Sequence, residues 1–177
     1  LVHLYSKCGS MRDAYRAFKN ITEPDTVSWN GLISGLASHR HIPDALSAFD
    51  DMRLAGVKPD SFTFLSLIFA CRQSSLLNLG LDYFYSMEKP YHITPKLDHY
   101  VCLVDLLGRG GRLEEAMGFI ETMPFKPDSV IYKTLLNVCN AHGNVLAAIY
   151  LLLACLYDNA GLAEFGDKTR KLMRERG

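Results

Sequence analysis

Apolar residues recur along the chain at helical spacing, in short segments separated by turn residues. The segment 26–38 carries five of them on one helical face: Val27, Trp29, Leu32, Ile33 and Leu36. After a break over residues 38–41, a second face carries Ala45, Leu46, Phe49 and Met52. Gly56 and Pro59 should end this second helix, because glycine permits a left-handed cap and proline cannot continue a helix. The pattern predicts a pair of helices over residues 26–60.

The pair is one of a series. Four turns contain the tripeptides EPD, KPD, TPK and KPD, which end at residues 25, 60, 96 and 128, at intervals of 35, 36 and 32. Buried-type aromatics step by the same intervals: Trp29, Phe64, Tyr100 and Tyr132. Small residues follow a similar period: Ala14, Ala45, Gly80 and Ala116. Because one helix pair cannot bury both of its faces, neighbouring pairs must stack. We therefore predict an all-α fold, an α-solenoid of stacked antiparallel helix hairpins.

Composition limits the chemistry that the chain can perform. Nineteen basic residues balance nineteen acidic ones, so no strong field draws a nucleic acid in from a distance, and any such binding should rest on base contacts. The five cysteines show no CxxC spacing, which argues against a disulfide framework or a zinc site. No charge-free apolar segment approaches the roughly 20 residues that span a bilayer. We expect no metal, no cofactor and no membrane partner.

The segments VSWNGLISGL, DALSAFDDM and GVKPD resemble the pentatricopeptide repeat. The alternating lengths resemble the plant PLS subclass, which mixes standard, long and short motifs. The resemblance implies a partial short motif over 1–25, a standard motif over 26–60, a long motif over 61–96 and a short motif over 97–128. Residues 129–177, with SVIYKTLLNVCNAHGNV and LLLACLYDNAGLAEFGDKTRKLMRERG, resemble the C-terminal extension (E) motifs of organellar RNA editing factors.

The resemblance breaks at one place. Members of the family carry a further helix between the HGNV and LLLACLYDN segments, and here an apparent internal deletion lies near residues 145–146. Ala148 and Leu152 keep the spacing that Ala116 and Ile120 have in the preceding unit. If the chain is continuous, we expect the helix over 146–159 to pack where the missing helix would lie. The deletion leaves the docking function of the extension motifs open.

The resemblance implies that each unit meets one unstacked RNA base. In the unit 26–60 the base-reading residues would be Asn30 and Asp60. An asparagine amide donates and accepts hydrogen bonds, so it can match a pyrimidine edge. The resemblance implies that this pair prefers uracil to cytosine. It also implies that threonine in place of Asn30 would change the preference to guanine. Val27 and Phe62, each second in its unit, would flank the base. The alternative is that Asn30 and Asp60 only cap helices.

The other units offer weaker base contacts. Val101 with Asp128 forms a poorly discriminating pair, and Leu65 with Lys96 lacks a hydrogen-bonding group at the first position. Asp25 would be the second half of a pair whose first half lies upstream of Leu1. With one strong complete pair, we expect a low affinity for RNA. Four basic residues near the C-terminus are candidates for phosphate contacts, or alternatively form a charged face that ends a helix: Lys168, Arg170, Lys171 and Arg174.

The resemblance implies a protein without catalytic residues that binds single-stranded organellar RNA, specifies a site of C-to-U editing, and recruits a separate deaminase and other editing cofactors. Zinc deaminases carry HxE and CxxC signatures, and neither occurs here, so we predict no enzyme activity. The expected location is the mitochondrion, with the chloroplast as the alternative. Two other functions stay open: a helical-repeat scaffold for protein interaction, and a factor for organellar RNA splicing, stability or translation.

Overall fold

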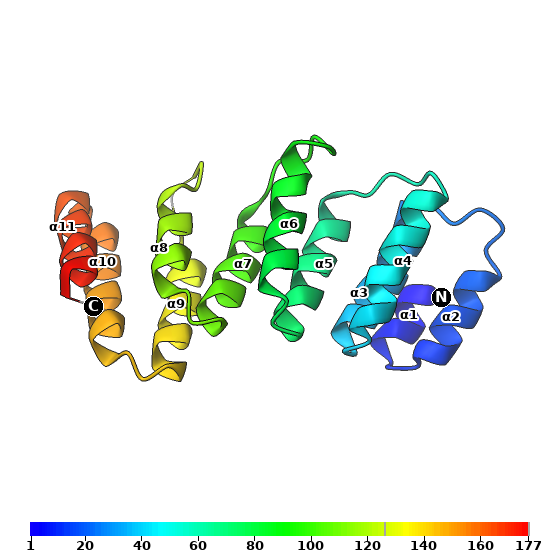
Figure 1. Ribbon diagram of the computed structural model, residues 1–177, viewed down its shortest axis with the longest axis horizontal. Helices are drawn as coiled ribbons and strands as arrows, with labels where there is room; N and C mark the ends of the chain where they lie inside the picture. The colour runs from blue at the N-terminus through cyan, green and yellow to red at the C-terminus, as the bar shows by residue number, and fades with distance from the viewer. Residues whose placement is uncertain (126, 177) are drawn as a thin grey trace. The chain divides into compact units, whose positions relative to one another are not determined.

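The computed structural model describes residues 1–125 and 127–176, except for the side chains of Val145, Asn159, Arg174 and Arg176 (Figure 1). This part of the chain consists of α-helices joined by turns and contains no strand, which confirms the predicted all-α class. The helices are α1 (Val2–Lys7), α2 (Met11–Lys19), α3 (Thr26–Ser38), α4 (Ile42–Leu54), α5 (Ser61–Gln73), α6 (Leu77–Glu88), α7 (Leu97–Arg109), α8 (Leu113–Glu121), α9 (Ser129–Ala141), α10 (Val145–Asn159) and α11 (Ala163–Arg176). None of the helices described is long and apolar enough to cross a membrane.

The helices form two compact units, Leu1–Cys102 and Leu103–Gly177, and the boundary falls within α7. In the first unit, α1, α3 and α5 contact one another in sequence, and α2, α4 and α6 each pair with the helix before them. In the second unit, α10 packs against α9 and α11 packs against α10. Both units are therefore built from helix pairs, as the repeat predicted.

Aspartate begins the first helix of several pairs. The carboxylates of Asp25, Asp60 and Asp128 accept hydrogen bonds from the first-turn N–H groups of α3, α5 and α9. These bonds satisfy donors that have no partner inside the helix. The second helix of this pair also begins and ends where the sequence predicted. Pro43 lies in the first turn of α4, and Gly56 takes a φ of 72° just after the end of α4. The repeated turn tripeptide is thus a helix-start signal.

The repeated aromatic residues explain how successive pairs are held together. All four are buried: Trp29, Phe64, Tyr100 and Tyr132. In the first unit, each contacts an aromatic ring from the pair before it, with ring centroids 4.5 Å apart for Phe18–Trp29, 5.9 Å for Phe49–Phe64 and 5.0 Å for Phe84–Tyr100. The contacts are edge-to-face, an arrangement that adds roughly 0.5–1.5 kcal/mol beyond burial. The aromatic period therefore marks the junctions between helix pairs.

Two details of the predicted helix faces were wrong. Val27 was assigned to the apolar face of its helix, but its side chain is 75% exposed. On α10, Leu152 keeps the spacing of the buried Ile120 but is 51% exposed, whereas Leu151 is 2% exposed. The reason is that α10 packs against two helices, α9 and α11, which turns Leu151 inward instead of its neighbour. α10 packs against α9, and its expected position in place of the missing helix stays a prediction.

Close approach of α7 to α9 requires a glycine. A Cβ atom added to Gly108 would lie 2.4 Å from Cγ1 and 2.6 Å from Cγ2 of the buried Val138, whereas one added to Gly118 on α8 would meet nothing within 4 Å. We expect Gly108→Ala to destabilise the fold by about 1–3 kcal/mol through overpacking. The matched variant Gly118→Ala should stabilise it by up to about 1 kcal/mol, because alanine favours the helix. Urea unfolding measures both.

A second substitution separates the clash from any other effect of alanine. Adding Val138→Ala to Gly108→Ala removes the methyl groups that the new Cβ would meet. The double variant should therefore lose less stability than the two single losses added together. Equal stabilisation by Gly108→Ala and Gly118→Ala would show that α7 and α9 do not approach as described.

Candidate nucleic-acid interface

Asn30 and Asp60 lie side by side, although 30 residues separate them in the chain. The amide nitrogen Nδ2 of Asn30 on α3 donates to Oδ1 of Asp60, at 2.9 Å. Asp60 is the residue that caps α5, so the bond joins one helix pair to the start of the next. Asn30 itself is 6% exposed. The two residues that the sequence paired are thus in direct contact, and Asp60 also has the capping role of the alternative interpretation.

Thr63 completes this contact, and the sequence analysis missed it. Its hydroxyl donates to Oδ1 of Asn30 at 2.6 Å and accepts from the backbone N–H of Asp60 at 3.0 Å. Asp60 in turn accepts from the N–H of Thr63, which makes a capping box. The signal was available in the sequence, because a threonine three residues after an aspartate cap suits this motif. The contact to Asn30, however, depends on the next helix pair.

The three residues fix which way the Asn30 amide faces. An ionised carboxylate only accepts hydrogen bonds, so the Nδ2 side of the amide must face Asp60. A flipped amide would place Oδ1 against the carboxylate, and both atoms are acceptors. Of the two donors and two acceptor positions of the amide, one of each is used by Asp60 and Thr63. One N–H and one oxygen lone pair remain, held in a set orientation.

The charge of Asp60 is maintained by its hydrogen bonds. Burial alone would raise the pKa of this carboxyl group, but the bonds from the Thr63 N–H and the Asn30 amide outweigh burial and lower the pKa. The carboxylate therefore stays ionised at neutral pH. The ionised form is the stronger acceptor for the bonds from Asn30 and from the helix, so the electrostatics and the geometry favour the same arrangement.

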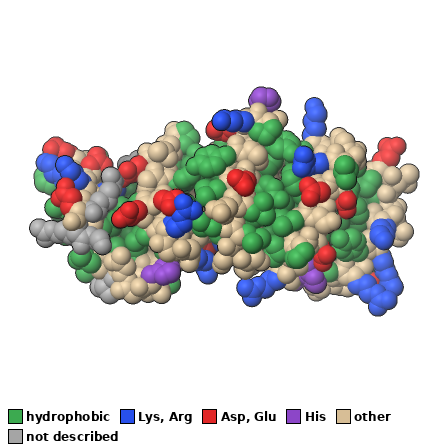
Figure 2. Space-filling model, in the orientation of Figure 1, with side chains coloured by type: hydrophobic (Ala, Val, Ile, Leu, Met, Phe, Trp, Pro, Cys, Tyr) green, Lys and Arg blue, Asp and Glu red, His purple; other side chains and the backbone are tan. Residues whose placement is uncertain are grey.

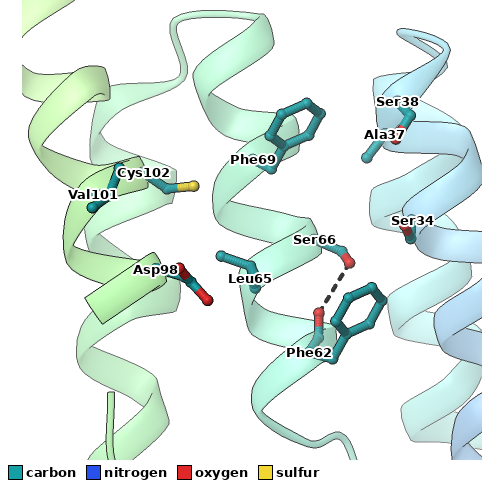
Figure 3. A pocket seen from close by; sticks show the side chains of 10 residues that line it. All are labelled: Ser34, Ala37, Ser38, Phe62, Leu65, Ser66, Phe69, Asp98, Val101 and Cys102. Atoms are coloured by element: carbon teal, nitrogen blue, oxygen red, sulfur yellow. Dashed lines mark hydrogen bonds between the residues drawn. The ribbon is translucent and has the colours of Figure 1, made fainter. Parts of the chain in front are cut away.

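An apolar groove lies along α5, next to this contact in the first unit. It has a volume of about 340 Å³ and is lined from three helices (Figure 3): Ser34, Ala37 and Ser38 of α3, Phe62, Leu65, Ser66 and Phe69 of α5, and Asp98, Val101 and Cys102 of α7. Phe62, predicted to flank a base, is 47% exposed at one end of the groove. The guanidinium of Arg72 lies 4.7 Å from the centre of the Phe69 ring. Leu65 and Val101, at base-reading positions, therefore share one apolar surface.

The long unit starts its helix differently. Lys96 stands where the other units have aspartate, and its backbone N–H donates to Nδ1 of His99 at 3.1 Å. The other ring nitrogen, Nε2, lies 2.8 Å from the carbonyl oxygen of Ser61, so Nε2 carries the proton and donates. His99 is 2% exposed and thus ties α7 to the start of α5. Lys96 itself is exposed, and no hydrogen bond links it to Leu65 among the contacts described.

The remaining predicted base-reading residues lie at helix starts or in the groove. Asp25 is exposed and caps α3, and hydrogen bonds from the hydroxyl and the N–H of Ser28 lower its pKa. Asp128 caps α9 through the N–H groups of Val130 and Ile131. Val101 belongs to the first unit and Asp128 to the second. Across the residues that the structure describes, no group of three His, Cys, Asp or Glu side chains could hold a metal ion.

Comparison with known proteins agrees with this repeat. A model described as the PPR repeat family matches residues 24–73, and one described as the PPR repeat matches residues 98–126. A chloroplastic pentatricopeptide repeat-containing protein of Arabidopsis thaliana is 52% identical over 99% of this chain. The chain is built from pentatricopeptide repeats. A mitochondrial protein of the same description, also from Arabidopsis thaliana, is 37% identical over the whole chain. The chain spans 22% of the first relative's length and 31% of the second's.

Solved structures share the fold. The crystal structure of the pentatricopeptide repeat protein PPR10 in complex with an 18-nucleotide psaJ RNA element matches 99% of this chain and 28% of that chain, with a TM-score of 0.69 and 24% identity. The PPR domain of protein-only RNase P 1 of Arabidopsis thaliana, in complex with tRNA, matches 96% of this chain and 95% of that chain, with a TM-score of 0.71 and 19% identity. At these identities the likeness shows the fold, which confirms the predicted solenoid of helix pairs.

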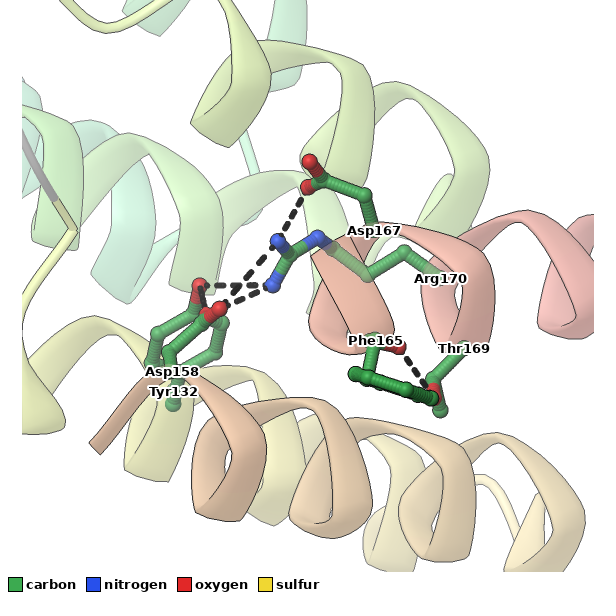
Figure 4. Close-up of polar contacts among 6 residues, drawn as sticks. All are labelled: Tyr132, Asp158, Phe165, Asp167, Thr169 and Arg170. Carbon is green, nitrogen blue, oxygen red and sulfur yellow. Dashed lines mark hydrogen bonds and ion pairs between the residues drawn. The ribbon is translucent and has the colours of Figure 1, made fainter. Parts of the chain in front are cut away.

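After the pentatricopeptide repeats, the C-terminal region contains a compact polar cluster (Figure 4). Arg170 on α11 donates to Asp158 Oδ2 at 2.7 Å and to the Tyr132 hydroxyl at 3.2 Å, and it also pairs with Asp167. The Tyr132 hydroxyl donates to Asp158 at 3.1 Å. Burial raises the pKa of Tyr132 to about 12, so the hydroxyl keeps its proton. The cluster fastens α11 to α9 and α10.

The cluster changes the view of the basic C-terminal residues. The side chain of Arg170 is 15% exposed and paired with two carboxylates, so its charge is largely neutralised and less available for a phosphate contact. Lys168 is exposed and pairs with Glu164 at 2.8 Å, and Lys171 is exposed. The side chain of Arg174 lies outside the described residues. Sequence analysis could not foresee the Arg170 contacts, because its partner Tyr132 is 38 residues away.

Removal of Arg170 should therefore cost stability. The Arg170→Ala variant leaves the largely buried Asp158, whose side chain is 11% exposed, without its cation, and removing one partner of such a pair costs up to about 3–5 kcal/mol. The Lys168→Ala variant removes an exposed pair on the same helix and should cost under about 1 kcal/mol. Denaturant unfolding followed by circular dichroism compares the two. Equal losses in the two variants would contradict the structural role of Arg170.

Proposed function

We propose that this chain binds single-stranded RNA through the inner helices of its repeats and that Asn30, held by Asp60 and Thr63, reads a uracil. The contact between Asn30 and Asp60 is the observation that carries the proposal. The N–H and the lone pair that remain on the amide complement the carbonyl and the N3–H of uracil. A base would enter between Val27 and Phe62, whose exposed apolar side chains can cover its faces.

The solved relatives support RNA as the ligand. PPR10 is crystallised with an RNA element and the PPR domain of protein-only RNase P 1 with tRNA, and both share the fold of this chain. The balanced charge of the chain means that phosphate contacts contribute little to affinity. Lys168 and Lys171 are proposed phosphate contacts, whereas Val101, Asp25 and Asp128 would serve weaker or incomplete base-reading pairs. Binding by this chain alone should therefore be weak and dominated by the single Asn30 contact.

The outcome of binding follows from the motif pattern. Alternating repeat lengths of 35, 36 and 32 residues, followed by segments that resemble extension motifs, favour a plant PLS protein that marks a cytidine for C-to-U editing. In this proposal a separate deaminase and other editing cofactors supply the chemistry, and the repeats supply the address. The location is an organelle, since the two relatives are described as chloroplastic and mitochondrial.

The test is an exchange of base preference. Fluorescence anisotropy at low salt compares the chain with Asn30→Thr on single-stranded RNAs that differ at one nucleotide. We expect the chain to favour uracil and Asn30→Thr to favour guanine, with a change of about tenfold or more, because a good bidentate base contact discriminates by roughly 1–3 kcal/mol. The control is Asn78→Thr, an exposed asparagine on the second helix of its pair, which should change nothing.

Two results would contradict the proposal. If wild type and Asn30→Thr bind all RNAs equally, Asn30 does not read a base. If neither binds any RNA while the chain captures a peptide regardless of Asn30, the repeats act as a protein-interaction scaffold. A shift toward guanine in Asn78→Thr would point to a general effect of threonine on the fold.

A further inference from the structure

Thr63 and His99 hold equivalent places in neighbouring units, because each is the third residue of its unit's first helix. The hydroxyl of Thr63 accepts the backbone N–H of Asp60, the residue before α5, at 3.0 Å. In the same way, Nδ1 of His99 accepts the backbone N–H of Lys96, the residue before α7, at 3.1 Å. Both side chains are buried. The two residues therefore complete the start of a helix in the same manner.

The two residues differ in the bond that each makes to the preceding unit. The Thr63 hydroxyl donates to Oδ1 of Asn30, the fifth residue of α3, at 2.6 Å. Nε2 of His99 donates instead to the backbone carbonyl of Ser61, the first residue of α5, at 2.8 Å. Both ring nitrogens of His99 are then in use, so neither can orient the fifth residue of α5, Leu65, or any side chain that replaced it.

Leu65 is nevertheless well placed to meet a base. It lies on the side of α5 that faces α7, beside Asp98 and Val101 in the apolar groove (Figure 3). Phe62 lies at one end of the same groove. Aromatic and aliphatic contacts of this kind tolerate any base, because every base has a face on which such side chains can pack. The unit 61–96 thus offers contact with a base but, in Leu65, no hydrogen-bonding group with which to select it.

We propose that the third residue of the following helix decides whether a unit selects a base. Thr63 makes the unit 26–60 selective, and His99 keeps the unit 61–96 unselective, so that this unit binds a nucleotide of any base. The inference rests on the proposed function, since it needs RNA in the groove. Basic and acidic side chains are interspersed on the face drawn in Figure 2, and phosphate contacts carry no sequence information. Selection therefore depends on hydrogen-bonding groups that are held in one orientation.

The last residue of a unit is not sufficient for selection. Asp60 holds the Nδ2 side of the Asn30 amide at 2.9 Å, and an aspartate in place of Lys96 could do the same for an amide at position 65. An amide held at one point can still swing about that bond. The Thr63 hydroxyl supplies the second point for Asn30, whereas His99 has no group free to supply it for position 65. Thr63 and His99 are therefore positioning residues, which act on a base through a neighbouring side chain.

The first test builds a second selective unit. Fluorescence anisotropy at low salt compares the double variant Leu65→Asn, Lys96→Asp with the triple variant that adds His99→Thr. The RNAs keep one uracil for Asn30 and vary the nucleotide on either side of it. We expect the triple variant to gain a preference of about tenfold for uracil over cytosine beside the first uracil, and the double variant to gain much less. Equal preferences in the two variants, or none in the triple variant, would overturn the inference.

The reciprocal variant tests the same position in the unit 26–60. Thr63→His should keep the bond from the Asp60 N–H, as His99 does at Lys96, and lose the bond to Asn30, so RNA should stay bound while the preference for uracil is lost. Thr63→Ser keeps the hydroxyl and should keep the preference. An unchanged preference in Thr63→His contradicts the inference. Because the two tests alter different units, a variant that loses its helices by circular dichroism in one test leaves the other decisive.

These outcomes are distinct from the test of the proposed function. If Asn30→Thr leaves the base preference of the chain unchanged, the proposed function fails and the inference fails with it. If Asn30→Thr changes the preference but Thr63→His does not, Asn30 reads a base without help from Thr63, and only this inference fails.

Discussion

A helix pair in this chain has apolar residues on two faces, and the second face can be buried only by the pair that follows. In the first unit this face is buried at successive junctions by contacts between aromatic rings: Phe18–Trp29, Phe49–Phe64 and Phe84–Tyr100. Each junction depends on a first helix that begins at a set place, because a shift of one residue would turn its aromatic by 100° away from its partner. Asp25 and Asp60 set that start by capping α3 and α5. Packing between helix pairs therefore depends on helix capping, because the cap fixes where the first helix starts and so where its aromatic side chain lies.

The capping of α5 also positions the residues around Asn30. Asp60 must cap α5 for the junction to form, and this position brings its carboxylate to Asn30 of the preceding pair. Thr63 lies in the first turn of α5 and reaches the other side of the amide. A side chain with exposed, mobile hydrogen-bonding groups would accept several bases. Asn30 has its orientation set by two neighbours, so, under the proposed function, the contacts that stabilise the repeat also orient the amide to discriminate between bases.

Helix starts could be predicted from the sequence, whereas contacts between neighbouring helix pairs could not. Turns, caps and aromatic periods are local or periodic signals, so the starts of α3 at Thr26 and α5 at Ser61 could be foreseen. The pairing of Asn30 with Asp60 was implied by the resemblance to the pentatricopeptide repeat. Contacts that depend on a neighbouring pair could not, and His99 at Ser61 is one of them. Arg170 looked like a free cation because a charged residue in a basic segment gives no sign of a partner 38 residues away. Leu152 was misplaced since α10 packs against two helices rather than one.

The central claim of this account is that Asp60 and Thr63 orient the Asn30 amide for the proposed base contact. The most direct measurement is the preference for uracil over cytosine in Thr63→Val, a variant of nearly the same shape that lacks the hydroxyl bonded to Asn30 Oδ1 and to the Asp60 N–H. The account predicts that this preference falls, because the amide is then held on one side only, by Asp60, while the helical content is unchanged. An unchanged preference for uracil, with RNA still bound, would contradict it.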